Sequence, residues 1–195
     1  MGSMKDKFSP SITNMIRMDH THVMATFHQY EPGTAPKTKQ ALVNTICVAL
    51  EIHTQLEEEI FYPALRAISK DRNTVDKAPA EHEQIRELIA RLRAMQPTDS
   101  YYDQTVMQLM RIVMHHLADE ETILLPEAEI YLADRLGELG MQMTRRRLQL
   151  AAPRAGEIAY NTMRGMPATS ILVAAGAVLA GTYLFRRSNK LRWQA

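Results

Sequence analysis

Six residues of this 195-residue chain have the types and spacing of metal ligands. They are four histidines and two glutamates: His20, His53, Glu57, His82, His116 and Glu120. Each glutamate follows a histidine by four residues, which places both side chains one turn apart on the same helix face. Buried carboxylates are costly unless they are paired or bind a cation. If these residues share one interior, the sequence predicts a metal centre.

The ligand types favour iron over zinc. The single cysteine, Cys47, can form neither a thiolate cage nor a disulfide framework, and no His-Glu-x-x-His zinc motif occurs. Imidazole with carboxylate suits iron, manganese or zinc. Six groups, two of which can bridge, can hold two ions about 3.5 to 4 Å apart. We therefore predict two non-haem iron ions per chain.

Four helix-period segments must position these ligands. They span about 11–30, 37–69, 76–96 and 100–125, and proline and glycine breakers separate them. Each carries one candidate histidine on its apolar stripe; in the fourth, His116 aligns with Val113 and Ile123. No segment alternates with period two, and no Asn-Gly or Asp-Gly hairpin turn occurs. The predicted fold class is all-α, an antiparallel four-helix bundle with one inward histidine per helix.

The second and fourth segments contain the same motif. His53 and His116 are each followed by Glu at +4, Glu at +5 and Pro at +10, the prolines being Pro63 and Pro126. The ferritin-like pattern Glu-x-x-His differs, because there the glutamate comes first. The repeat predicts that two helices present their ligands in the same way.

The order of these motifs resembles the hemerythrin-like (HHE cation-binding) domain over residues 10–135. This resemblance implies a di-iron centre, oxo- or hydroxo-bridged, with Glu57 and Glu120 bridging and an open position for O2, nitric oxide or peroxide. Family members include oxygen carriers and sensors, iron sensors, and proteins tied to nitric oxide stress and iron-sulfur repair. We expect O2 binding or sensing. The alternatives are an iron-sulfur-repair or peroxide- and nitric-oxide-consuming enzyme, and a membrane-tethered sensor or interaction module.

The chain departs from the oxygen carriers of that family at two positions. Carriers have a second histidine on the third helix, where this chain has Arg86, which implies a more open iron and favours turnover over storage. Carriers also space the fourth-helix pair by five, which would select His115 in place of His116. The internal repeat and the apolar stripe favour His116, and His115 is the reserve candidate.

Several neighbours of the candidate ligands have less specific roles. Glutamates that follow the ligands are expected to be solvated or to orient imidazoles: Glu58, Glu59 and Glu121. His22 and His28 are expected to be surface or packing residues and not ligands. Three tyrosines either line the site or pack in the core, and the sequence leaves both roles open: Tyr30, Tyr62 and Tyr102.

Charge divides the chain into two parts. Residues 1–136 contain 14 lysines and arginines against 20 aspartates and glutamates, whereas residues 137–195 contain 9 against 2. The acidic part would repel phosphate backbones, so no nucleic-acid partner is expected. The predicted units are a polar segment 1–10, the bundle 11–136, a basic amphipathic linker 137–166 and a hydrophobic tail helix 167–195 with a basic end.

The tail helix is expected to anchor the protein in a membrane. Residues 168–185 are uncharged and mostly apolar, and as a helix they would span about 27 Å of a hydrocarbon core of roughly 30 Å. Small residues recur at a spacing of four, as in Gly176 and Ala180, which favours a homo-oligomer formed through the tail. Since no secretory signal is visible, the bundle is expected on the cytoplasmic side.

Overall fold

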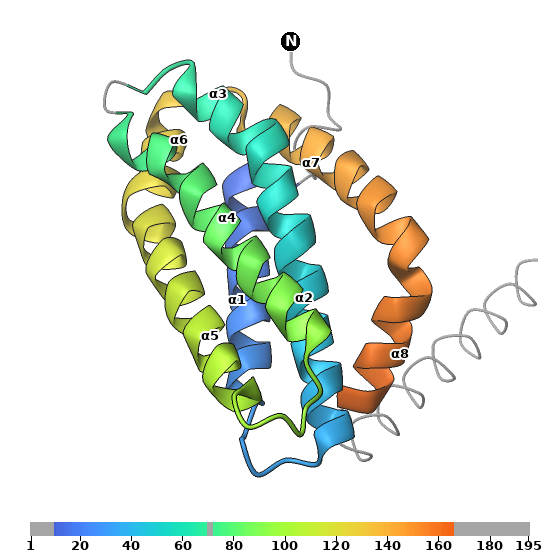
Figure 1. Cartoon of the computed structure of the whole chain (residues 1–195). Helices are drawn as coiled ribbons and strands as arrows, with labels where there is room; N and C mark the ends of the chain where they lie inside the picture. The colour runs from blue at the N-terminus through green and yellow to red at the C-terminus, as the bar shows by residue number, and fades with distance from the viewer. Residues whose placement is uncertain (1–9, 70–71, 166–195) are drawn as a thin grey trace, which may run out of the picture.

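Four helical rods form the body of the protein in the computed structural model, which describes residues 10–69 and 72–165 (Figure 1). Their helices are α1 (Ile12–His28), α2 (Pro36–Leu56) with α3 (Tyr62–Arg66), α4 (Asn73–Ala94), and α5 (Tyr102–Asp119) with α6 (Leu125–Tyr131). No strand occurs among the described residues. The all-α prediction is therefore confirmed for this part of the chain.

The repeated motif folds into a repeated distortion. A π-helical turn, Glu57–Phe61, joins α2 to α3, and a second, Glu120–Leu124, joins α5 to α6. In each turn the next backbone N–H donates to the carbonyl five residues back, that of Glu57 or Glu120. The prolines of the motif follow closely, and a proline has no N–H for the regular i−4 ladder. Both long rods therefore change helical phase at their candidate ligands.

Apolar side chains fill the bundle above and below the candidate histidines. One buried cluster surrounds Phe61 and Leu124, where α3, α6 and the start of α1 meet. The other surrounds Ile46 and Val113, between the far halves of the rods. All four predicted histidines lie between these clusters along their helices, so the core keeps bulk water away from that level.

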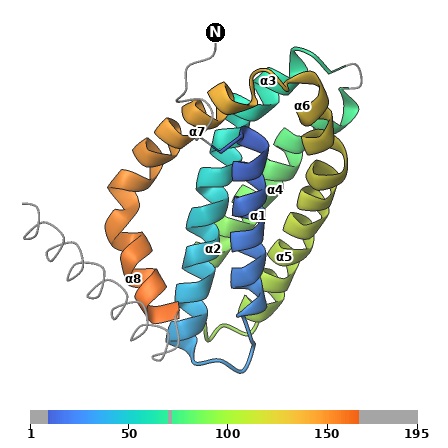
Figure 2. The same cartoon turned by 180° about the vertical axis from the view of Figure 1, so that it is seen from behind.

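Residues 136–165, where a linker was expected, form helices that cover the bundle. α7 (Leu136–Ala151), a 3-10 turn (Ala152–Arg154) and α8 (Ala155–Gly165) run back along α1 and α2 (Figure 2). Arginines of this α7–α8 arm pair with acidic residues of those two rods: Arg146 with Glu59 at 2.6 Å, Arg147 with Asp19 at 2.5 Å, and Arg154 with Glu51. The opposite charges of the two parts of the chain thus meet across this interface.

Gly140 sets how closely α7 approaches the start of α1. A Cβ at this position would lie 2.1 Å from the carbonyl oxygen of Pro10, a backbone atom that cannot turn away. We expect Gly140→Ala to destabilise the protein by about 1 to 3 kcal/mol, because overpacking forces backbone shifts. Urea unfolding measures this change. Gly156→Ala on α8 is the matched control, since a Cβ there meets nothing within 4 Å; equal stabilities of the two variants would contradict the prediction.

The expected membrane localisation is corrected by the structure. None of the helices within 10–69 and 72–165 has the length and apolar character needed to cross a membrane. The tail helix predicted for 167–195, with the oligomer contact assigned to it, lies outside the described residues.

Candidate metal centre

The six predicted ligands come together inside the bundle. Their side chains belong to residues that are at most 5% exposed. Their ligand atoms form two close groups, one of His20, His53, Glu57 and Glu120, and the other of Glu57, His82 and His116. Glu57 is the member that both groups share. The arrangement therefore offers two neighbouring cation positions with a carboxylate between them.

Short distances link the two groups. Glu57 Oε2 lies 3.2 Å from His53 Nε2 and 3.5 Å from His82 Nε2. Glu120 Oε2 lies 3.1 Å from His20 Nε2 and 3.6 Å from His116 Nε2. Each glutamate therefore contacts one histidine from each group, as two bridging carboxylates would.

Tyr62 is a member of the site that the sequence left undecided. Its buried hydroxyl donates to Glu120 Oε1 at 2.8 Å and lies 3.4 Å from Glu57 Oε2 and 3.2 Å from His82 Nε2. Tyr62 follows Glu57 by five residues, and only a π-helical turn stacks residues five apart. Burial and the neighbouring carboxylates raise the pKa of Tyr62 well above its ordinary value, so the hydroxyl keeps its proton.

Each histidine directs Nε2 toward the centre and Nδ1 toward an acidic side chain of another rod. The pairs are His20 with Glu121 at 2.7 Å, His53 with Asp19 at 3.5 Å, His82 with Glu58 at 2.9 Å and His116 with Glu81 at 2.9 Å. These contacts form a closed ring, because each rod supplies a carboxylate to the next one. Such partners fix the orientation and tautomer of an imidazole that binds a metal.

Arginines stand behind three of these four carboxylates. Arg17 pairs with Glu121 at 3.2 Å, Arg147 with Asp19 at 2.5 Å, and Arg86 with Glu58 at 2.9 Å. Burial raises the pKa of Asp19, but the hydrogen bonds with His53 and Arg147 outweigh it and keep that pKa below its ordinary value. Asp19 is therefore ionised at neutral pH and can support His53.

The sequence indicated some of these partners and missed others. Of the three glutamates expected to be solvated or to orient imidazoles, Glu58 and Glu121 contact histidines, whereas Glu59 pairs with Arg146 outside the site. Asp19 and Glu81 were not singled out. Each directly precedes a candidate histidine in the chain but contacts a histidine of a different rod. Their position next to a candidate ligand is therefore the one signal in the sequence that could have indicated them.

The residues considered as alternatives lie outside the cluster. His115 is exposed, and it gathers with Glu81 and Asp119 at the surface while His116 points inward. Arg86, which stands where carriers have a further histidine, pairs with Glu58 and Glu83. His22 and His28 are exposed. The cluster of described residues thus has four histidines.

Burial and neighbouring charges shift the pKa values of the two clustered glutamates and of His20. Burial raises the pKa of Glu57 well above its ordinary range, and the charge of Glu120 raises it further. Burial acts the same way on Glu120, but the hydrogen bond with His20 and the charge of His116 outweigh it and lower that pKa to about 2. Burial also opposes protonation of His20, yet Glu120 and Glu57 raise its pKa to about 9. The carboxylates therefore need a positive charge between them, supplied by protons or by a cation.

Two unpaired atoms show that a cation fits. Among the described residues, His53 Nε2 and Glu57 Oε1 are buried without a hydrogen-bond partner. A buried polar atom without a partner is costly, and both atoms can offer a lone pair to a metal. Neutral imidazole and carboxylate together are a donor set that iron accepts. The residues present thus fit the metal that their types predicted.

Asp19→Asn should weaken metal binding without touching a ligand. The change removes the charge that faces His53 Nδ1 and leaves Arg147 without its partner. We expect the affinity for ferrous or zinc ion to fall about 10- to 100-fold, measured by competition with a chelator. Glu59→Gln is the control. Glu59 pairs with Arg146, the residue next to Arg147 in the sequence, but contacts no histidine. Equal affinities of the two variants would show that the outer carboxylate is irrelevant.

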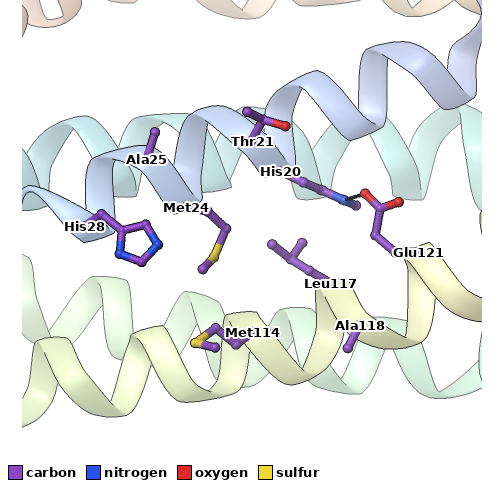
Figure 3. Close-up of a pocket in the computed structure, with 9 residues that line it drawn as sticks. All are labelled: His20, Thr21, Met24, Ala25, His28, Met114, Leu117, Ala118 and Glu121. Carbon is purple, nitrogen blue, oxygen red and sulfur yellow. Dashed lines mark hydrogen bonds and ion pairs between the residues drawn. The ribbon is translucent and has the colours of Figure 1, made fainter.

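A groove between α1 and α5 leads to one side of the cluster. It has a volume of about 530 Å³ and is lined mainly by apolar side chains, including Met24, Met114 and Leu117. Figure 3 shows the linked His20 and Glu121 at one end of this groove and His28 at the other. A small apolar molecule can therefore approach His20 along a mainly apolar wall.

Comparisons with known proteins agree with this geometry. The family model described as "Hemerythrin HHE cation binding domain" matches residues 11–128. A Nostoc protein named "DNA nickase" is 30% identical over 119 residues, 61% of this chain but 34% of that protein, so the chain spans about a third of this relative. An uncharacterized protein of Mycobacterium bovis is 31% identical over 125 residues, 60% of this chain and 74% of that protein.

A solved structure has the same fold. It is the crystal structure of a hemerythrin HHE cation binding domain-containing protein from Mycobacterium kansasii. The TM-score is 0.62 at 22% identity, and the match covers 80% of this chain and 99% of that chain. At this identity the likeness establishes the fold alone.

Proposed function

Because this chain belongs to the hemerythrin HHE cation binding domain family, we propose that its buried cluster holds two non-haem iron ions and binds O2 or a related small molecule. The observation that carries the proposal is Glu57, which is buried and shared by two groups of close ligand atoms. A carboxylate between two positions suits a pair of ions better than one. Bound iron would supply the coordination position and the redox chemistry.

The residues of this chain give such a centre its environment. The four acid–histidine contacts hold the Nε2 atoms inward, so the ligands are oriented before any ion arrives. Apolar clusters on both sides exclude bulk water. The groove beside His20 supports entry of an apolar diatomic molecule. The hydroxyl oxygen of Tyr62 lies 2.8 Å from Glu120 Oε1, and its proton can be donated in a hydrogen bond.

Metal analysis and optical spectroscopy test the proposal. The full chain, loaded with ferrous iron without oxygen and desalted, is expected to retain about two iron ions. Exposure to O2 should change the visible spectrum, and removal of O2 should restore the first spectrum if binding is reversible. A chain that retains no iron, or whose spectrum is unaffected by O2 and nitric oxide, would contradict the proposal.

A second candidate function, turnover of peroxide or nitric oxide, is favoured by two observations. Tyr62 places a proton donor beside both glutamates, and Arg86 replaces a possible further histidine, which leaves more room at one iron. Rapid mixing with one equivalent of oxidant distinguishes the two functions. A binding protein returns to the ferrous state when the gas is removed, whereas a turnover enzyme ends in the ferric state with the oxidant consumed.

A further inference from the structure

A second cavity, partly open to solvent, lies under the α7–α8 arm, away from the metal centre. It has a volume of about 210 Å³ between α1, α2 and α8, and Figure 2 shows these three helices side by side. Its apolar walls come from Val48, Ala49, Ile52 and Ile158. None of the six candidate ligands lines it, so any function of this cavity is separate from the proposed iron chemistry.

One polar group in this cavity has no partner. Asn161 on α8 is 3% exposed, and its Nδ2 atom makes no hydrogen bond to any described residue. An amide N–H buried in this way is costly, so native proteins rarely leave one unpaired. Because the unpaired atom is a donor, whatever satisfies it must offer an acceptor.

The two threonines of the wall donate their hydroxyl hydrogens to the backbone of their own helices. The hydroxyl of Thr45 donates to the carbonyl of Ala41 at 2.9 Å, and that of Thr162 donates to the carbonyl of Ile158 at 2.7 Å. No lysine, arginine, aspartate or glutamate lines this space, and His22 is the one titratable residue there. The cavity therefore suits an uncharged occupant that is mostly apolar.

We propose that this cavity, with the buried amide of Asn161 in its wall, is a binding site for a small neutral ligand with an apolar body and one acceptor oxygen, such as a ketone or an alcohol. At roughly 30 Å³ for a group the size of water, the space accommodates roughly seven non-hydrogen atoms. A smaller cavity of about 160 Å³ adjoins it and shares His22, Ala49 and Ile52. That space is bounded by Asp19 and Arg147, whose charges stop an apolar ligand from extending further.

Cyclohexanone and methylcyclohexane are matched probes, because both have seven non-hydrogen atoms and only the ketone has an acceptor. Binding to the full chain is measured by ligand-observed NMR, with and without metal. We expect saturable binding of cyclohexanone, about tenfold tighter than that of methylcyclohexane, since one hydrogen bond separates them. Asn161→Leu should abolish this preference while the hydrocarbon still binds. Ala49→Phe, which fills the space from α2, should remove both ligands.

Met163→Leu is the control on the same helix, because Met163 is 63% exposed and does not line the cavity. It should bind both probes as the parent does. Thermal unfolding checks that each variant folds, and Ala49→Phe decides the outcome if Asn161→Leu does not fold. Absence of saturable binding would mean that ordered water alone satisfies Asn161. An unchanged preference for the ketone in Asn161→Leu would show that Asn161 is not the hydrogen-bond donor to the ligand. Either result overturns the proposal.

Discussion

Glu57→Gln is expected to reduce the iron content from about two ions per chain to below about one. Glu57 is shared by both groups of ligand atoms, so the substitution removes an anionic ligand from each position at once. Loss of an outer partner alone costs about 10- to 100-fold in metal affinity, and loss of the shared ligand should cost more than about 100-fold. Metal analysis after desalting, with chelator competition, measures the effect.

The same variant should fold at least as well as the parent when metal is absent. Glutamine keeps the shape of Glu57 but has no charge, and the raised pKa of Glu57 means that burying this carboxyl at pH 7 costs either protonation or a buried charge. Urea unfolding of the metal-free proteins at pH 7 therefore separates lost ligation from misfolding. Glu83→Gln is the matched control, because Glu83 lies on the surface of α4 with a 62% exposed side chain. A Glu57→Gln protein that retains about two tightly bound ions would refute the bridging role.

Metal loading should raise the stability of the folded protein by about 4 kcal/mol when free metal exceeds its dissociation constant a thousandfold. For a chain of this size, that corresponds to an increase in Tm of roughly 10 °C. The cause is that the folded bundle brings together ligands that lie far apart in the unfolded chain. Calorimetry with and without metal measures the difference. An unchanged Tm under saturating metal would show that the cluster does not bind it.

Between pH 7 and pH 9 the metal-free form should lose stability, whereas the stability of the loaded form should change little. In the metal-free protein the carboxylates hold the pKa of His20 at about 9, above its ordinary 6.5, so its stabilising contribution is full below 6.5 and is lost as pH rises toward 9. The raised pKa of Glu57 acts in the same direction. The lowered pKa values of His53 and His82 matter only below pH 6.5.

Metal binding removes this trend. An ion must displace the protons that the metal-free cluster holds, so apparent affinity increases as pH rises through the pKa of His20. The Tm of the metal-free protein is therefore expected to fall between pH 7 and pH 9, while the gap between loaded and metal-free forms widens. Parallel curves for the two forms would contradict the proposed ligand role of His20.

The positions of the rods and the inward orientation of the six candidate ligands were accessible from the sequence, because both follow from local periodicity. A histidine on an apolar stripe, such as His82 with Ile85 and Ile89, has to face the core if the segment is an amphipathic helix. The four-residue step from His53 to Glu57 then places the glutamate on the same face. Neither inference requires knowing which rods are neighbours.

The phase of the two long rods beyond their glutamates was not accessible. A regular helix through His116 predicted Ile123 on the inner face, but Ile123 is 46% exposed and Leu124 is buried. The π-helical turn Glu120–Leu124 inserts an extra residue and rotates everything after it. The corresponding turn after Glu57 brings Tyr62 to the site, where regular helical spacing gave no reason to place it.

Periodicity along one helix determined which side chains face inward; contacts between helices were decided only by the tertiary structure. Asp19 supports His53, Glu81 supports His116, and Arg147 reaches Asp19 from α7. Each contact depends on which rods are adjacent and how far one is shifted along another. A single sequence records the period of each helix, but the packing of whole side-chain surfaces sets those shifts.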